Sequence, residues 1–274
     1  YVGPTGDHGW TYQHHLGRNA VEAAGIKTTY VESVPEGADA ERVIRQLAQS
    51  GHGLIFTTSF GYMDPTNKVA KDFPNVKFEH ATGYKREHSN VSTYGARFYQ
   101  GRTLLGHIAG NMTKTNTIGY IGSFPIPEVV RGINAFYLAA SKVNPDIKIK
   151  IIWAFTWYDP GKEADAAKTL INQGADILVQ HTDTFAPCQE AEKAGVLAFG
   201  QASNQEEFCP NSHLTAIEDV WGPYYAERAK AVVDGTWSSS DTWEGMDKGM
   251  VVMSPYNAKL MPSDLIQEAV AMEI

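Results

Sequence analysis

Short apolar runs alternate with longer amphipathic stretches along the whole chain. Apolar runs bounded by glycine or polar residues are typical of buried strands, and apolar residues three and four apart are typical of helices. The predicted strands are 28–32, 53–57, 76–80, 117–122, 148–155, 176–180, 196–200, 213–217 and 249–253. The predicted helices are 11–24, 38–50, 65–73, 98–112, 127–143, 160–173, 186–194 and 222–234. This alternation predicts an α/β protein with parallel sheets and helical crossovers.

Two of the predicted helices carry explicit start signals. Asp64 stands directly before Pro65, and Asp159 directly before Pro160. A carboxylate at the N-cap accepts a free backbone N–H, and proline fits the first helical turn because its own N–H is not needed there. We therefore expect helices to begin at these two prolines.

The first half of the chain is repeated in the second half. Residues 47–59 align with residues 170–182, and each stretch holds a helix end, a glycine and a short apolar strand. Tyr-Val-Gly at 1–3 matches Tyr-Ile-Gly at 120–122 with nearly the same offset. The repeat predicts two homologous α/β lobes.

We assign lobe 1 to residues 1–112 and lobe 2 to residues 113–217. The segment from about 218 to 274 follows the second repeat, so we expect it to cross back to lobe 1 and to complete a multi-strand hinge. Open α/β sheets bind ligands beyond the carboxyl ends of their strands, so two such lobes predict a cleft lined from both sides. Residues 1–3 have the pattern of the end of a strand, whose beginning we expect upstream.

Composition excludes some classes of function. The chain has 274 residues and a net charge of −8, with no local run of lysine or arginine, which argues against a nucleic-acid surface. No apolar stretch is long enough to cross a bilayer, and no signal segment is recognisable in the sequence. The two cysteines, Cys188 and Cys209, permit a disulfide without requiring one.

Five stretches, taken together and in order, resemble the basic membrane protein family of substrate-binding proteins. They are residues 1–10, 58–65, 124–136, 157–160 and 180–183. The resemblance covers essentially the whole chain and implies the two-lobed periplasmic-binding-protein fold, with a parallel sheet flanked by helices in each lobe. It implies a purine base or nucleoside as ligand and the membrane permease of an ABC importer as partner. It also implies a periplasmic or other extracytoplasmic location, with a lipid anchor left open.

The loop after the first strand holds three candidate ligand contacts, which are Asp7, His8 and Trp10. An indole ring can stack on a flat heterocycle, and a carboxylate can accept its N–H groups. The alternative is structural: Trp10 would be the first buried residue of its helix, and Asp7 a loop cap.

Two further segments follow predicted strands. Ser59, Phe60 and Gly61 follow strand 53–57, where a loop near a ligand needs small or planar groups, although Phe60 could equally pack beneath the loop. Trp157 follows strand 148–155, so its ring could close over the second face of a purine. The family resemblance also implies an aromatic ligand contact at about this position.

Polar side chains follow the next strands of lobe 2. His181 and Asp183 stand two residues apart and would point the same way in an extended segment. A zinc site needs three or four convergent ligands, and no spaced partner is visible, so we expect a hydrogen-bonding pair and no metal. Gln201 and Asn204 offer amides that can donate and accept.

Two positions depart from the family pattern. Many members of the family have an aspartate near Asn204, so the resemblance does not carry a ligand-binding carboxylate over to this position. Relatives that bind nucleosides have a lysine near Asp219, and an acid in its place favours a ligand with N–H donors, such as adenine. A solvent-facing hinge residue is the alternative for Asp219, and Trp221 completes the expected site.

The sequence therefore predicts a binding protein without cofactor or catalysis, which captures an adenine-like purine by hinge closure. Another planar small molecule is the first alternative. A nucleoside hydrolase would need a clustered acidic motif and usually a metal. A sugar-responsive DNA-binding repressor would need a helix-turn-helix, and none precedes Tyr1 in this sequence.

Overall fold

The computed structural model describes residues 1–273, which divide into two compact units. Unit 1 is built from Tyr1–Gly6, Thr11–Ala96 and Val220–Glu244. Unit 2 is built from Asp7–Trp10, Arg97–Asp219 and the chain from Gly245 onward. The fold is of the expected class, an α/β fold with two parallel sheets flanked by helices.

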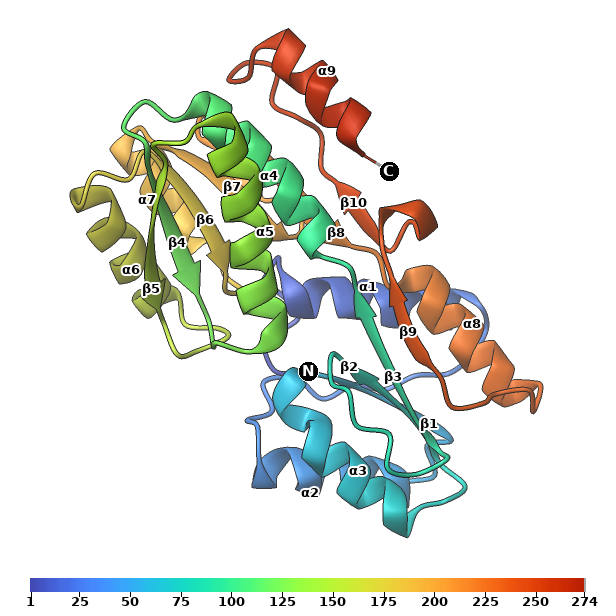
Figure 1. Cartoon of the computed structure of the whole chain (residues 1–274). Helices are drawn as coiled ribbons and strands as arrows, with labels where there is room; N and C mark the ends of the chain where they lie inside the picture. The colour runs from blue at the N-terminus through green and yellow to red at the C-terminus, as the bar shows by residue number, and fades with distance from the viewer. Residues whose placement is uncertain (274) are drawn as a thin grey trace. The chain divides into compact units, whose positions relative to one another are not determined.

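Unit 1 contains a four-stranded parallel sheet in the order β1-β2-β3-β9. Its strands are β1 (Leu54–Thr58), β2 (Lys77–Ala81), β3 (Val91–Ala96) and β9 (Asp241–Glu244). Its helices are α1 (Trp10–Ala23), α2 (Ala38–Gln49), α3 (Met63–Asp72), α8 (Gly222–Val233) and the 3₁₀ turn η1 (Phe60–Tyr62). Figure 1 shows α2 and α3 on one face of this sheet and α1 and α8 on the other.

Side chains from both sheet faces form the core of unit 1. On the face covered by α2 and α3, Ile44 and Val69 pack with Ile55 and Phe78 of the sheet. On the other face, the buried Tyr225 hydroxyl is hydrogen-bonded to Tyr94 Oη and to His14 Nδ1, each at 2.6 Å. Alternate residues of a strand point to opposite faces, so a sheet covered on both sides needs apolar residues in succession.

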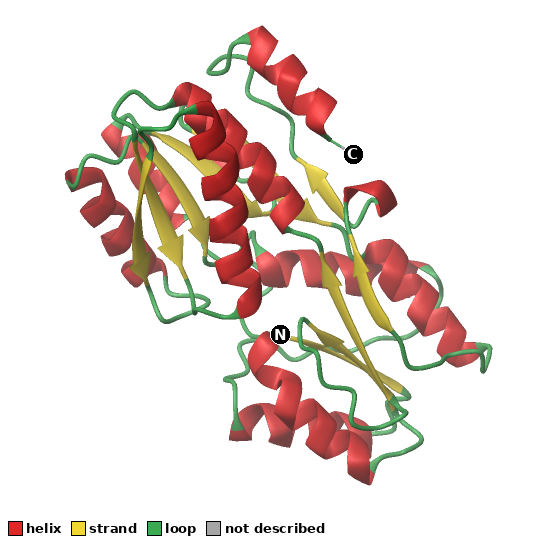
Figure 2. Ribbon diagram, viewed as in Figure 1, coloured by secondary structure: helices red, strands yellow, loops and turns green. Residues whose placement is uncertain are grey.

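Unit 2 contains a six-stranded sheet in the order β10-β8-β7-β6-β4-β5, in which only β10 is antiparallel among the described strands (Figure 2). Its strands are β4 (Thr117–Gly122), β5 (Lys148–Trp153), β6 (Ile177–His181), β7 (Leu197–Ala202), β8 (His213–Asp219) and β10 (Val251–Met253). Its helices are α4 (Tyr99–Met112), α5 (Pro127–Val143), α6 (Pro160–Asn172), α7 (Ala186–Ala194), α9 (Ser263–Met272) and the 3₁₀ turns η2 (Glu206–Phe208) and η3 (Met246–Lys248).

Helix α4 belongs to unit 2, because it packs closely along α5. A Cβ on Gly106 would collide with the carbonyl oxygen of Phe136, and one on Gly110 would lie 2.9 Å from Ala140 O. The division therefore falls at Ala96, one helix before the boundary expected at residue 112. The chain beyond Gly245 also groups with unit 2, whereas the sequence analysis assigned it to lobe 1.

The internal repeat is visible in the backbone. The end of α2, Gly51 and β1 correspond to the end of α6, Gly174 and β6, and the two glycines have similar positive φ values of 86° and 96°. Only glycine takes this conformation without a steric cost, which explains why both copies keep it.

The helix-start signals had different outcomes. Asp159 caps α6 as expected, and its side chain accepts from Lys162 N at 3.0 Å. The other expectation was wrong, because α3 begins at Met63, directly after the 3₁₀ turn η1, and Asp64 lies in its first turn.

Strands β3 and β9 and helix α9 were not predicted, and residues 28–32 do not form a strand although one was predicted there. The two cysteines form a disulfide, with Cα atoms 5.7 Å apart, a normal span. Among residues 1–273, no helix is long and apolar enough to cross a membrane.

Candidate ligand-binding site

The loop at Asp7–Trp10 is held within unit 2 by contacts with two loops at the carboxyl ends of β6 and β7. Ser203 Oγ donates to Gly9 O at 3.2 Å, and Gln205 Nε2 donates to His8 O at 3.2 Å. A Cβ on Gly9 would lie 2.6 Å from the carbonyl oxygen of Asp183, so only glycine fits there. By these contacts the Asp7–Trp10 segment groups with the unit that also holds Trp157, whereas the sequence analysis expected Trp10 in lobe 1.

Two buried acids lie in these loops. Asp7 Oδ1 accepts from Gly9 N at 2.9 Å, and Asp183 N donates to the carbonyl oxygen of Trp157 at 2.9 Å. Burial raises the pKa of Asp183 well above its ordinary value, and the negative charges of Asp7 and Glu163 raise it further. Asp183 Oδ2 has no hydrogen-bond partner among residues 1–273. A protonated Asp183 can both donate and accept.

Glu163, in the first turn of α6, ties the Trp157 loop to the loop after β6. Its Oε1 accepts from Asp159 N at 3.1 Å, and its Oε2 accepts from Thr184 N at 3.1 Å and from Thr184 Oγ1 at 2.7 Å. Burial raises the pKa of Glu163 to about 7. The sequence analysis missed this residue, and its only signal was an acid four positions after the N-cap.

A buried arginine lies behind the end of β6. Arg102 Nη2 donates to Gln180 O at 2.8 Å and to Gln201 Oε1 at 2.6 Å. Burial lowers the pKa of His181 well below its ordinary value, and the charge of Arg102 lowers it further, so the imidazole is neutral. The sequence analysis missed Arg102 too, although it is a lone charge inside the otherwise uncharged first three turns of α4.

Aromatic rings gather on the same loops. Phe185 and Phe208 are stacked with centroids 3.8 Å apart, and the His8 ring meets Phe208 edge-on at 4.9 Å. Trp157 is half-buried, with its ring 5.2 Å from that of Phe124, and Trp10 is half-buried at the start of α1. Phe185, Phe208 and Phe124 were not among the expected contacts.

Three expected polar residues of unit 2 have different settings. Gln201 lies within β7 and not after it, and it is buried against Arg102. Asn204 is exposed, and its Oδ1 caps η2 by accepting from Glu206 N at 3.0 Å. Asp219 ends β8 and is buried, and its pKa is raised well above the ordinary value by burial and by Glu128, against the opposing charge of Arg102.

The remaining expected residues lie in unit 1. Ser59 Oγ donates to Glu36 Oε1 at 2.5 Å, and Gly61 N donates to the same oxygen at 3.1 Å. Glu36 is a further residue that the sequence analysis missed. Phe60 is half-buried beside Tyr84, and the fully buried Trp221 ring is stacked on His14 at 4.8 Å. Within residues 1–273, no group of three or more His, Cys, Asp or Glu side chains is arranged to hold a metal ion.

Comparison with known proteins gives the family. A family model described as "ABC transporter substrate-binding protein PnrA-like" and named Bmp matches residues 1–274. The chain belongs to the Bmp family. Its members are substrate-binding proteins and not enzymes, as the sequence analysis expected, and the resemblance to the basic membrane protein family is confirmed.

Relatives and solved structures agree with this assignment. The Bmp-family chain is 59% identical over 268 residues to the purine-binding protein of Brucella abortus, covering 97% of the chain and 76% of that relative. It is 38% identical over 258 residues to a Haloferax volcanii protein with a provisional name as an ABC transporter glucose-binding protein, covering 93% and 66%. A solved solute-binding protein of Aeropyrum pernix matches the fold with a TM-score of 0.83 at 20% identity, covering 98% and 83%.

Proposed function

We propose that this Bmp-family chain binds a purine base or nucleoside, with adenine-like ligands favoured, and delivers it to the permease of an ABC importer. The observation that carries the proposal is the 59% identity, over 97% of the chain, to a protein named for purine binding. The arrangement of unit 2 supports it, because the half-buried Trp157 and the buried Asp183 follow the carboxyl ends of β5 and β6, and the Asp7–Trp10 segment contacts the loops after β6 and β7.

The acids suit the edge of an adenine ring. Adenine presents an amino donor beside a ring-nitrogen acceptor. Burial raises the pKa of Asp183 well above its ordinary value, and a protonated Asp183 can donate to a ring nitrogen, while a carboxyl oxygen of Asp7 can accept from an amine. The neutral His181 adds no repelling charge, and the rings of Trp10 and Trp157 offer stacking surfaces.

Transport requires both capture and release of the ligand, and we propose that closing and opening of a hinge between the units provide them. The chain passes between the units after Ala96, Asp219 and Glu244, in addition to the short loop at Asp7–Trp10. A ligand biases such an equilibrium only if it binds one state better than the other. Scattering with and without a tight ligand tests this step, and an unchanged radius of gyration at saturation counts against it.

We place the protein outside the cytoplasm, in the periplasm or at a cell surface. The Cys188–Cys209 disulfide supports this, because such bonds persist mainly in oxidising compartments.

A second candidate ligand is a sugar, because one relative carries a provisional name for glucose binding. Aromatic rings and carboxylates can also bind a sugar ring, so the two ligands are distinguished by measurement. The test is a thermal-shift and calorimetry panel of adenine, adenosine, guanosine, hypoxanthine, glucose, ribose and amino acids. A true ligand at a hundredfold excess over Kd stabilises the protein by about 2.7 kcal/mol.

The outcomes of the panel separate the hypotheses. Stabilisation by a purine, reduced in an Asp183→Ala variant that melts like the parent, supports the proposal. Stabilisation by glucose or an amino acid and by no purine overturns the ligand assignment. Turnover of a nucleoside by the pure protein would instead indicate an enzyme.

A further inference from the structure

The sheet of unit 2 does not join the loops that follow β6 and β7 in the described part of the chain. The ladder between these two strands ends at the pair formed by Leu178 and Ala198. Beyond this pair, residues 179–181 continue along β4 on one side, and residues 200–202 continue along β8 on the other. The two loops that carry much of the candidate site therefore need another connection.

The Cys188–Cys209 disulfide is a covalent connection between these loops. Cys188 lies in the first turn of α7, whose N-cap is Phe185, and Cys209 directly follows η2. Both cysteines are buried, with exposed fractions of 1% and 0%. The rings of Phe185 and Phe208, one from each loop, stack with centroids 3.8 Å apart. The loop after β6 is thus joined to the loop after β7 where each of them ends.

The Asp7–Trp10 segment contacts both of the joined loops. Ser203 and Gln205, in the loop after β7, donate to carbonyl groups of this segment at 3.2 Å. On the loop after β6, the carbonyl oxygen of Asp183 lies so close to Gly9 that a Cβ would be only 2.6 Å away. The segment makes these contacts through its own backbone, so its position depends on how far apart the two loops are held.

We propose that the Cys188–Cys209 disulfide positions the Asp7–Trp10 segment for ligand binding, and that ligand affinity falls when the disulfide is removed. The inference rests on the proposed function, because Asp7 and Trp10 are expected ligand contacts. With the disulfide, the two loops hold the segment in place before the ligand arrives. Without it, only a fraction of the free protein keeps the binding arrangement, and the apparent affinity falls in proportion to that fraction.

Other contacts keep the rest of unit 2 together when the disulfide is absent. Asn211 donates to the carboxylate of Glu192, on α7, through its backbone N at 3.0 Å and through Nδ2 at 2.5 Å. Within the strands, Arg102 bridges β6 and β7 by donating to Gln180 O and Gln201 Oε1. We therefore expect the effect of the missing disulfide to be concentrated in the loops, where it changes affinity in a protein that still folds.

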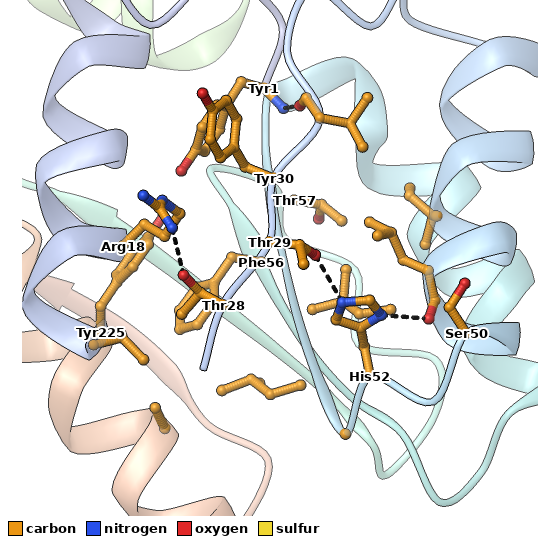
Figure 3. Close-up of a pocket in the computed structure, with 18 of the residues that line it drawn as sticks. Tyr1, Arg18, Thr28, Thr29, Tyr30, Ser50, His52, Phe56, Thr57 and Tyr225 are labelled. Carbon is orange, nitrogen blue, oxygen red and sulfur yellow. Dashed lines mark hydrogen bonds between the residues drawn. The ribbon is translucent and has the colours of Figure 1, made fainter. Parts of the chain in front are cut away.

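The test compares the parent with a Cys188→Ala, Cys209→Ala double variant of the full chain. Amide exchange is measured in peptides covering 7–10 and 203–209, and affinity for adenine is measured by calorimetry. Residues 50–57 belong to unit 1 and border its cavity of about 570 Å³ (Figure 3), and their exchange is the internal reference. Leu170→Ala empties a buried core position of unit 2 and keeps the disulfide, so it is the matched control for lost stability.

We expect the double variant to bind adenine about tenfold more weakly, as when about a tenth of the free molecules keep the binding arrangement. Exchange should be faster in both loop peptides, by about tenfold, and unchanged in residues 50–57. Leu170→Ala should bind adenine as the parent does. An equal loss of affinity in Leu170→Ala would show that general destabilisation is the cause, and would overturn the proposal.

A double-mutant cycle with Gln205→Ala tests whether the disulfide acts through the loop after β7. In the parent, this substitution removes the hydrogen bond to His8 O and should weaken adenine binding by about threefold to tenfold. In the variant without the disulfide it should weaken binding less, because the loop has already left the segment in most molecules. Two effects that simply add would overturn the proposal.

Three further results would also overturn it. They are unchanged exchange at residues 7–10, faster exchange there with unchanged affinity for adenine, and a double variant that does not fold. A parent that binds no adenine would contradict the proposed ligand instead. In that case the exchange at residues 7–10 still decides whether the disulfide positions the segment.

Discussion

Replacing Trp157 with alanine tests whether its ring binds the ligand. The substitution removes the indole but keeps the backbone carbonyl that accepts from Asp183 N at 2.9 Å, so the loop retains its anchor. Aromatic stacking on a base is worth about 1–3 kcal/mol, so we expect roughly a tenfold to hundredfold loss of purine affinity. A Trp157→Phe variant keeps a ring and should recover part of the affinity.

The expected loss of folding stability is small, because Trp157 is only half-buried and its ring centroid lies 5.2 Å from that of Phe124. Emptying a fully packed aromatic position costs about 3–5 kcal/mol, so the half-buried Trp157 should cost less and the fold should survive. Calorimetry with adenine and circular-dichroism melts are measured together. Tyr137→Ala, at a 46% exposed position on α5, is the matched control and should change neither quantity.

Two results would refute this reasoning. A Trp157→Ala protein that unfolds would show that the ring belongs to the core. If Trp157→Ala and Trp10→Ala both melt like the parent and bind purine with unchanged affinity, the stacking hypothesis is wrong.

Three further predictions concern stability. A Cys188→Ala, Cys209→Ala double variant should have a free energy of unfolding in urea about 3 kcal/mol lower than the parent, because the disulfide joins residues 21 positions apart. An unchanged urea midpoint would contradict this. Burial lowers the pKa of His213 to about 4, so its contribution to folding stability is complete above pH 6.5 and is lost as the pH falls towards 4. Over this range the free energy of unfolding of the parent should fall by up to about 3 kcal/mol relative to that of His213→Phe. The pH dependence for Glu163 has the opposite sign. Because its pKa is raised to about 7, its contribution to folding stability is present below pH 4.5 and is lost as the pH rises through 7, by up to about 3 kcal/mol. This decrease in the free energy of unfolding with pH should be absent in Glu163→Gln.

Most of the fold could be predicted because its signals are local. Helices α5 and α7 have the predicted bounds, and β4 does too, because each is bounded by proline, glycine or a clear end of the apolar run. Strand β3 was missed because Ser92 and Thr93 interrupt its apolar pattern, and both are buried against distant partners: Arg228 Nη2 donates to Ser92 Oγ, and Thr93 Oγ1 donates to Asp241 Oδ1. Burial of that kind depends on partners far along the chain.

The site was less predictable for the same reason. The strand-end rule led to Asp7, Trp157 and Asp183, since it needs only the order of elements. It could not find the contact between Arg102 and Gln201, which are 99 positions apart. It also could not find the contacts that hold the Asp7–Trp10 loop, because they come from residues almost 200 positions away.

We expect the choice between purines to depend on Asp219, an acid at a position where the family resemblance implies a lysine in nucleoside-binding relatives. It is buried at the end of β8, where the nearby charge of Arg102 opposes the rise in its pKa caused by burial and Glu128. Whether ionised or protonated, Asp219 can accept from the amino group of adenine, whereas the carbonyl oxygen of hypoxanthine offers no such donor. We therefore expect adenine to bind more tightly than hypoxanthine, by up to about tenfold for one hydrogen bond. An Asp219→Ala variant that keeps its melting temperature should lose this preference and bind both bases about equally. Tighter binding of hypoxanthine by the parent, or an unchanged preference in the variant, would show that Asp219 does not contact the ligand.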